Sequence, residues 1–217
     1  MHLKTFLLSS TLLLASASVQ AAVIGGISGI NAIADTVSAA NGNFLNWQSV
    51  TAADTVDLAT LGNDLTDAEV STYVFSIEPV ASIDMAFTAT PVYNGAGNDL
   101  VLFFVGNGFS FDFDADAGGS GAAINYGVTD TGFGVTDIFG DTWSLSAAQI
   151  DLADFGFDSG QQLGDFRVTL GDDLGRPALA LVGGFNTQPL VVPVPAALWL
   201  FVSGLAALGL FTRRPSC

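Results

Sequence analysis

The most strictly alternating stretch of the sequence is Phe109-Ser110-Phe111-Asp112-Phe113-Asp114-Ala115-Asp116. Successive side chains of a β-strand point to opposite faces, so an extended chain here places three phenylalanines on one side and the carboxylates on the other. Such a pattern predicts a strand with one face packed in a core and the other in contact with water. The stretch therefore favours a protein built from two-faced sheets.

Strand-length runs of similar character extend outward from this stretch. Each is rich in β-branched or aromatic residues and is bounded by Gly, Asn, Asp or Pro, which favour turns. Short strands at this spacing predict an all-β fold, an antiparallel β-sandwich or jelly roll with few helices. Residues 22–66, which include Trp47, predict irregular structure with short strands. The eight predicted strands are 72–77, 83–90, 100–105, 109–115, 123–128, 142–145, 166–170 and 178–182.

The charge of the chain is strongly acidic. The 217 residues, enough for one domain with its own core, include 21 Asp and Glu but five Lys and Arg, for a net charge of −16. Lys4, Arg213 and Arg214 lie in the terminal segments, so the middle sets two arginines against 21 acids, a net charge of −19. Such a surface repels phosphate backbones, which excludes nucleic acids as partners.

Common catalytic residue types are missing between residues 22 and 212, where the sequence contains no His, Cys or Lys. Most nucleophile–base pairs need one of them, so we expect no enzyme. The lone Cys217 also means that the core forms without intrachain disulfides. A carboxylate-dependent glycoside hydrolase needs only two acids and stays an alternative, although nothing around the two glutamates, Glu69 and Glu78, indicates a general acid.

The N-terminus has the order of features of a secretory signal peptide. Lys4 gives a positive start, residues 6–14 form an apolar run, and Val19-Gln20-Ala21 is a small-residue site for signal peptidase. Cleavage between Ala21 and Ala22 would remove residues 1–21. The alternative is a first core helix of the domain.

The C-terminus has the features of a membrane span. Residues 194–211 form an almost uninterrupted apolar run of 18 residues, and Arg213-Arg214 follows at once. This length is at the short limit for a transmembrane helix, and the arginines should remain in the cytoplasm. A buried core helix is the alternative.

The residues that open this span resemble a known sorting signal. Val192-Pro193-Val194-Pro195-Ala196, followed by the apolar run and Arg213-Arg214, resembles a PEP-CTERM signal of the VPLPA type. Val194 stands where that type has Leu, and the ending Pro215-Ser216-Cys217 is not typical. The resemblance covers about the last 25 residues and says nothing by itself about a ligand.

Several partners and a location are implied by this resemblance. An exosortase would recognise residues 190–217 and cleave near the proline motif. The chain would be anchored in the inner membrane of a Gram-negative bacterium until processing, and would then reach the cell surface or extracellular matrix, where exopolysaccharide is a partner. Residues 22–189 would be the exported domain. Its residues 97–104, 150–156 and 166–170 loosely resemble galactose-binding-like jelly rolls found ahead of such signals, which assigns no catalytic residue.

Calcium is a candidate ligand of Asp112, Asp114 and Asp116, which precede Gly118-Gly119. Calcium takes several oxygen ligands, but an EF-hand loop would need Gly and Glu where this chain has Ala117 and Ala123. Alternate side chains of a strand also stand roughly 7 Å apart. A solvated strand face is therefore the favoured interpretation of these three aspartates. Asp172-Asp173 is a second possible cluster of oxygen ligands, and the favoured interpretation there is a polar turn.

Sugar binding would need hydrogen-bonding groups beside an aromatic ring. Arg167 and Arg176 are either ion-paired or sugar ligands. The rings available for stacking or for the core are Trp47, Tyr93, Tyr126 and Trp143. We therefore expect a non-catalytic exported surface or matrix protein that acts in biofilm adhesion or glycan contact; the alternatives are a hydrolase, a calcium-dependent adhesin and a purely structural matrix component.

Overall fold

The structure is a computed structural model, and it describes residues 21–46, 56–76, 78, 80–117, 121–137, 140–170 and 177–187. Of the predicted signal-peptidase site, Ala21 and Ala22 are described, and both are exposed. Within these described ranges, no helix is long and apolar enough to cross a membrane. The predicted features that lie outside them are residues 1–20, Trp47, Gly118-Gly119, Asp172-Asp173, Arg176 and the sorting signal with its span and arginines.

One sheet has five antiparallel strands, in the order β10 (Ile124–Gly127), β9 (Ser110–Asp114), β13 (Phe166–Leu170), β7 (Ala81–Ala86) and β4 (Thr36–Asn41). The alternation of β9 has the predicted effect, because Phe111 and Phe113 are buried while the polar residues between them are partly exposed. Pairing places Phe113 opposite Val168 and Phe111 opposite Leu170. The apolar face of the sheet is thus continuous from strand to strand.

The second sheet is larger. Its order is β11 (Thr129–Thr136), β12 (Thr142–Ile150), β8 (Leu100–Val105), β14 (Ala178–Gly184), β6 (Val74–Ser76) and β5 (Phe44–Asn46), and β3 (Ala32–Ile33) also pairs with β14. The central strands β8 and β14 are buried at every position. Both faces of this sheet are therefore covered at its centre.

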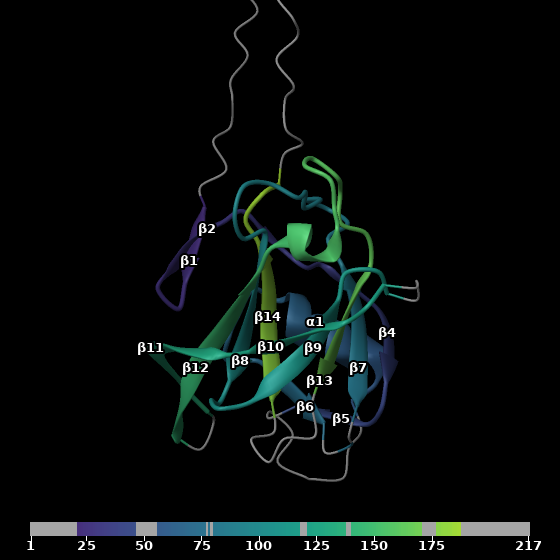
Figure 1. Cartoon of the computed structure of the whole chain (residues 1–217). Coiled ribbons are helices and arrows are strands. Elements are labelled where there is room, and N and C mark those ends of the chain that lie inside the picture. Colours follow the sequence, from purple (N-terminus) through teal and green to yellow (C-terminus); the bar gives the residue numbers. More distant parts are fainter. Residues whose placement is uncertain are drawn as a thin grey trace, which may run out of the picture.

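The two sheets face each other across the main core, as Figure 1 shows. Phenylalanines of both sheets meet there: the rings of Phe104 and Phe111 are 4.7 Å apart between centroids. Within the five-stranded sheet, the rings of Phe113 and Phe166 are 5.4 Å apart. Such aromatic contacts add to the burial of apolar area that stabilises the fold.

A single α-helix in the described residues, α1 (Leu58–Thr66), closes one side of the sandwich. It contacts β4 of one sheet and β5, β6 and β14 of the other. The carboxylate of Asp57 caps its first turn by accepting a hydrogen bond from the Thr60 backbone N–H at 2.8 Å. Leu61 and Leu65 are buried in the main core, so the helix is held mainly by packing.

A hairpin of β1 (Ala22–Ile24) and β2 (Ile27–Ile30) lies on the outer face of the larger sheet. Its turn, Gly25-Gly26, has positive φ angles of 53° and 76°, which favour glycine. A Cβ atom would lie 2.8 Å from Leu145 Cδ2 at Gly25 and 2.8 Å from a Phe133 ring carbon at Gly26. The turn can therefore approach β11 and β12 this closely only because it carries no side chains.

The predicted antiparallel all-β architecture is confirmed, and the structure is consistent with a β-sandwich; the finer jelly-roll assignment remains a prediction. Predicted strands 100–105 and 166–170 coincide with β8 and β13. Residues 129–136 form β11 although the sequence predicts no strand there, and α1 replaces part of the predicted irregular region. A short 3-10 helix, η1 (Leu152–Phe155), follows β12.

Candidate functional site

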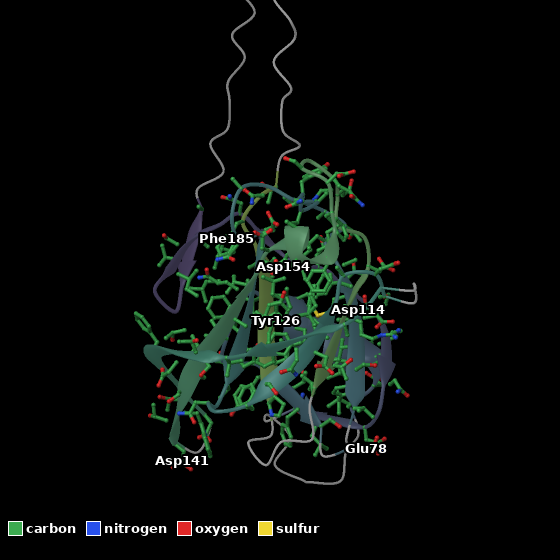
Figure 2. The ribbon with its side chains drawn as sticks, viewed as in Figure 1. Glu78, Asp114, Tyr126, Asp141, Asp154 and Phe185 are labelled. Carbon is green, nitrogen blue, oxygen red and sulfur yellow. The ribbon has the colours of Figure 1, made fainter. Side chains whose placement is uncertain are left out.

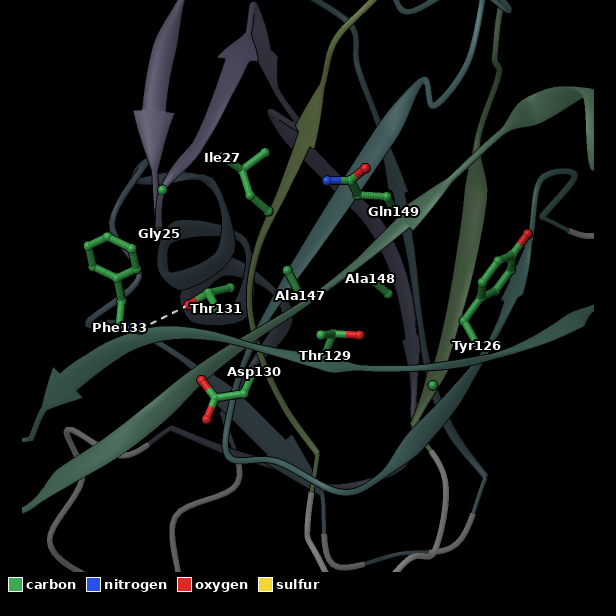
Figure 3. A pocket seen from close by; sticks show the side chains of 12 residues that line it. Gly25, Ile27, Tyr126, Thr129, Asp130, Thr131, Phe133, Ala147, Ala148 and Gln149 are labelled. Carbon is green, nitrogen blue, oxygen red and sulfur yellow. Dashed lines mark hydrogen bonds between the residues drawn. The ribbon is translucent and has the colours of Figure 1, made fainter.

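An open hollow of about 690 Å³ lies between the β1–β2 turn, β12 and the connected strands β10 and β11. Figure 3 shows it with the hairpin on one side and Tyr126 on the other. Its volume is in the range typical of ligand sites. We call this hollow the hairpin groove, and its lining is Gly25, Gly26, Ile27, Tyr126, Gly127, Thr129, Asp130, Thr131, Phe133, Ala147, Ala148 and Gln149.

The floor of the groove exists because the chain changes sheet there. Strand β10 pairs with β9 in the five-stranded sheet, and after Val128 the chain continues as β11, which pairs with β12 in the other sheet. The β11–β12 register shifts between Asp130 and Phe133, and Thr131 Oγ1 donates to the Leu145 carbonyl at 2.6 Å. This bulge sets Asp130, Thr131 and Phe133 along the groove.

Hydrogen-bonding side chains come from both strands. Asp130 is exposed, and its Oδ1 accepts from the Gly132 backbone N–H at 2.8 Å. Gln149 Oε1 accepts from Asn98 Nδ2 at 2.5 Å. That bond fixes the carboxamide so that its nitrogen lies on the side of Ile27, as Figure 3 shows. The residues that line the groove therefore include one amide and one acid.

Two aromatic rings bound the groove. Phe133 is 53% exposed and lies beside the hairpin turn. Tyr126 is partly buried and stacks against Phe155, with ring centroids 6.4 Å apart. Burial raises the pKa of Tyr126 to about 12, and the negative charges of Asp154 and Asp151 act in the same direction. Its hydroxyl is therefore neutral at physiological pH.

Among the lining residues described above, Asp130 is the only acid. Glycoside hydrolysis uses two carboxyl groups that flank the scissile bond. A smaller recess of about 200 Å³ has Asp114, Asp116 and Asp154 among its lining residues. That volume is below the usual range for a ligand pocket.

The predicted calcium residues lie on β9 and just beyond it. Asp112 Oδ1 accepts from Asn125 Nδ2 at 2.7 Å, and Asp114 Oδ1 accepts from the Asp116 backbone N–H at 3.0 Å. In the part of the chain that the structure describes, no group of three His, Cys, Asp or Glu side chains is arranged to hold a metal ion. Calcium binding by these residues remains a prediction.

Arg167 lies on the outer face of the five-stranded sheet and is ion-paired, one of the two roles considered for it. Its guanidinium donates from Nε to Asp84 Oδ1 at 2.6 Å and from Nη2 to Asp84 Oδ2 at 2.8 Å. These bonds raise the pKa of Arg167 further. A bidentate pair of this kind holds both side chains in place.

The other residues considered for stacking are dispersed. Tyr93 forms an isolated bridge with Gln162 in the loops, whereas Trp143 is 43% exposed on β12. Of the four, Tyr126 lines the groove. Nothing in the sequence shows that β11 lies beside the hairpin. Sequence reasoning therefore misses four residues of the groove lining, which are Thr129, Asp130, Phe133 and Gln149.

Comparison with protein-family models, with curated proteins and with solved structures found no match to this chain. The two family resemblances, of the C-terminal segment to PEP-CTERM signals and of the domain to galactose-binding-like jelly rolls, therefore remain predictions.

Proposed function

We propose that this chain is a non-catalytic exported protein of the cell surface or extracellular matrix, whose β-sandwich contacts neutral polysaccharide through the hairpin groove. The observation that supports this most is the mixed lining of the groove, which includes the exposed Phe133 ring together with Asp130 and Gln149. A sugar has apolar C–H faces and a rim of hydroxyl groups. It is therefore complementary to a surface that combines an aromatic ring with hydrogen-bonding residues.

Export and sorting are proposed on the basis of the two terminal segments. Signal peptidase would remove residues 1–21, and the helix after the Val192–Ala196 motif would hold the chain in the inner membrane until an exosortase cleaves it. The domain would then join the exopolysaccharide outside a Gram-negative cell.

The charge of the domain favours a neutral glycan. Two arginines oppose 21 acids between the terminal segments, and one of these acids, Asp130, is among the residues that line the groove. Polysaccharides that carry uronate or sulfate groups would be repelled by this field. Neutral polysaccharides are not repelled by the negative charge of the domain.

The test is affinity electrophoresis of the full-length chain in detergent, through native gels that contain dextran, glucomannan or the polyanion alginate. We expect retardation by a neutral polymer and none by alginate. The double variant Asp130→Ala/Gln149→Ala should weaken binding about tenfold, because it removes two hydrogen-bonding groups.

A matched control is Asp158→Ala/Gln161→Ala. These two residues are also exposed, and neither is among the residues that line the groove. The Asp158 backbone N–H donates a hydrogen bond of 2.9 Å to Gln161 Oε1. The control variant should leave binding unchanged. Failure of every neutral polymer to retard the folded protein, or equal losses in both double variants, would contradict the proposed function.

A further inference from the structure

Two exposed aromatic side chains share the outer face of the β11–β12 pair. Phe133 pairs with Leu145 and Val135 pairs with Trp143, so Phe133 and Trp143 are diagonal neighbours on one face. Such positions are roughly 7–8 Å apart. Val135 and Leu145 between them are buried, whereas Phe133 is 53% and Trp143 43% exposed. The two rings therefore stand at the surface over an apolar base.

Trp143 is held in a defined orientation. Its indole Nε1 donates to Asp137 Oδ2 at 3.0 Å. Asp137 is itself fixed by the β11–β12 turn, because its Oδ1 accepts from the Asp141 backbone N–H at 2.9 Å and its own N–H donates to the Asp141 carbonyl at 2.9 Å. A ring that is already positioned loses little conformational entropy when a ligand stacks on it.

We propose that Phe133 and Trp143 are successive stacking positions for a linear neutral polysaccharide that runs from the hairpin groove along β11. This inference rests on the proposed function of the groove and adds the length and shape of the ligand. Phe133 belongs to both surfaces, since it lines the groove and lies diagonal to Trp143. Two positions roughly 7–8 Å apart on one face are too far apart for one sugar ring to stack at both, so the ligand spans at least two units.

The charges beside the rings indicate the same ligand chemistry. Asp130 lies in the groove at one end, and Asp137 and Asp141 lie at the turn beside Trp143. A chain with an acid on each unit would bring its charges close to these carboxylates. A neutral chain can instead accept and donate hydrogen bonds at both ends.

The experiment compares a monosaccharide with a hexasaccharide, both prepared from dextran or glucomannan, whichever retards the protein in the gels. Binding to the full-length chain in detergent is measured by calorimetry. Trp143→Ala should weaken hexasaccharide binding about five- to tenfold and leave monosaccharide binding at the groove unchanged, because a stacked ring is lost only from the distal position. Phe133→Ala should weaken the binding of both.

Two further variants separate stacking from structural damage. Trp143→Phe keeps a ring and should retain most of the hexasaccharide affinity even though it removes the bond to Asp137. Leu58→Ala removes a side chain that is 45% exposed on α1 and should change neither affinity. Thermal melting of each variant checks that it is folded.

Three results would overturn the inference. If Trp143→Ala weakens monosaccharide and hexasaccharide binding equally, or weakens neither, the site does not extend beyond the groove, although the groove itself still binds sugar. Loss of self-association in Trp143→Ala, seen by sedimentation, would assign these rings to contact between copies. Absence of binding by both saccharides to the unaltered chain would instead remove the proposed function as well.

Discussion

Asp35 and Asp64 are two carboxyl groups on which the fold acts in opposite ways. Burial alone would raise the pKa of Asp35, but hydrogen bonds from the Thr88 hydroxyl and from the Thr88 and Ala89 backbone N–H groups lower it overall. Burial raises the pKa of Asp64, and the negative charge of Asp67 adds to this, while a hydrogen bond from Asn46 partly opposes it. Relative to the unfolded chain, folding therefore makes Asp35 a stronger acid and Asp64 a weaker one.

The sign of each contribution to stability follows from linkage. Because the pKa of Asp35 is lowered, its contribution is present above the unfolded pKa of about 3.9 and is lost as the pH falls through the folded value. Because the pKa of Asp64 is raised, its contribution is present below the unfolded value and is lost as the pH rises through the folded value.

Substitution of each aspartate by asparagine tests these signs. Asp35→Asn should lower the free energy of unfolding at pH 7 by about 1 kcal/mol, since its amide nitrogen cannot accept from a backbone N–H. Asp64→Asn, which removes a disfavoured charge, should leave stability at pH 7 unchanged or higher. Urea unfolding at pH 7 and at acidic pH measures both. Equal losses at pH 7 would contradict the opposite shifts.

At the scale of elements, the fit between β14 and its neighbours depends on Gly184. A Cβ atom at this position would overlap Val92 Cγ2 and lie 3.5 Å from Phe87 Cε1 and 3.6 Å from Ala32 Cβ. A Cβ atom at Gly127 on β10 would instead have no neighbouring atom within 4 Å. These two strand glycines therefore differ in the space available to a methyl group.

Alanine at these two positions should have different effects. Gly184→Ala should destabilise the protein by about 1–3 kcal/mol, because extra volume in a packed core forces its neighbours to shift. Gly127→Ala should be neutral or slightly stabilising. Thermal or urea unfolding measures both changes, and a Gly184→Ala protein as stable as the parent would show that β14 packs more loosely than its contacts indicate.

The elements that could be predicted from sequence are those whose burial leaves a pattern. Strand β9 alternates, and β8 is a continuous apolar run buried on both faces. Strand β11 leaves little pattern, because it is mostly exposed and contains Gly132 and Gly134. Helix α1 is short and contains Gly62 and Asn63, which have low helix propensity, so its composition does not predict a helix. Its helical conformation is stabilised mainly by its apolar contacts with the rest of the domain.

The candidate site was less predictable than the sheets for the same reason. The groove depends on β11, on the β1–β2 turn and on the passage of the chain from one sheet to the other. The residues that meet there are separated in sequence by about a hundred residues, as the neighbours Gly26 and Phe133 show. Because the sequence does not predict β11, it does not indicate that Tyr126 lies in a groove with residues of β11 and of the β1–β2 turn.

At the scale of the whole molecule, the proposed route to the cell surface makes a prediction about mass. Protein recovered from outside a host that has its exosortase should lack residues 199–217, because cleavage is expected near Pro193 and Pro195. Intact-mass spectrometry of the secreted material measures this. Recovery of mature protein that still includes Trp199 to Cys217 would contradict the sorting proposal.

The control is the same host without its exosortase, in which the protein should keep the C-terminal segment and stay with the membrane. A Pro193→Ala/Pro195→Ala variant in the unaltered host should accumulate in the same uncleaved form. If that variant is processed normally, the motif is not what the protease recognises.

Strand β1 begins and β14 ends at the same end of the sandwich, as Figures 1 and 2 show, with Phe185 just beyond β14. A pulling force on the chain beyond Thr187 would act along β14, which is bonded to β8 on one side and to β3 and β6 on the other. Those bonds would be sheared together and share the load. A force on Ala21 would instead peel the two-stranded β1–β2 hairpin bond by bond. We therefore expect the domain to resist force better when it is held by its C-terminal end than when it is held by its N-terminal end.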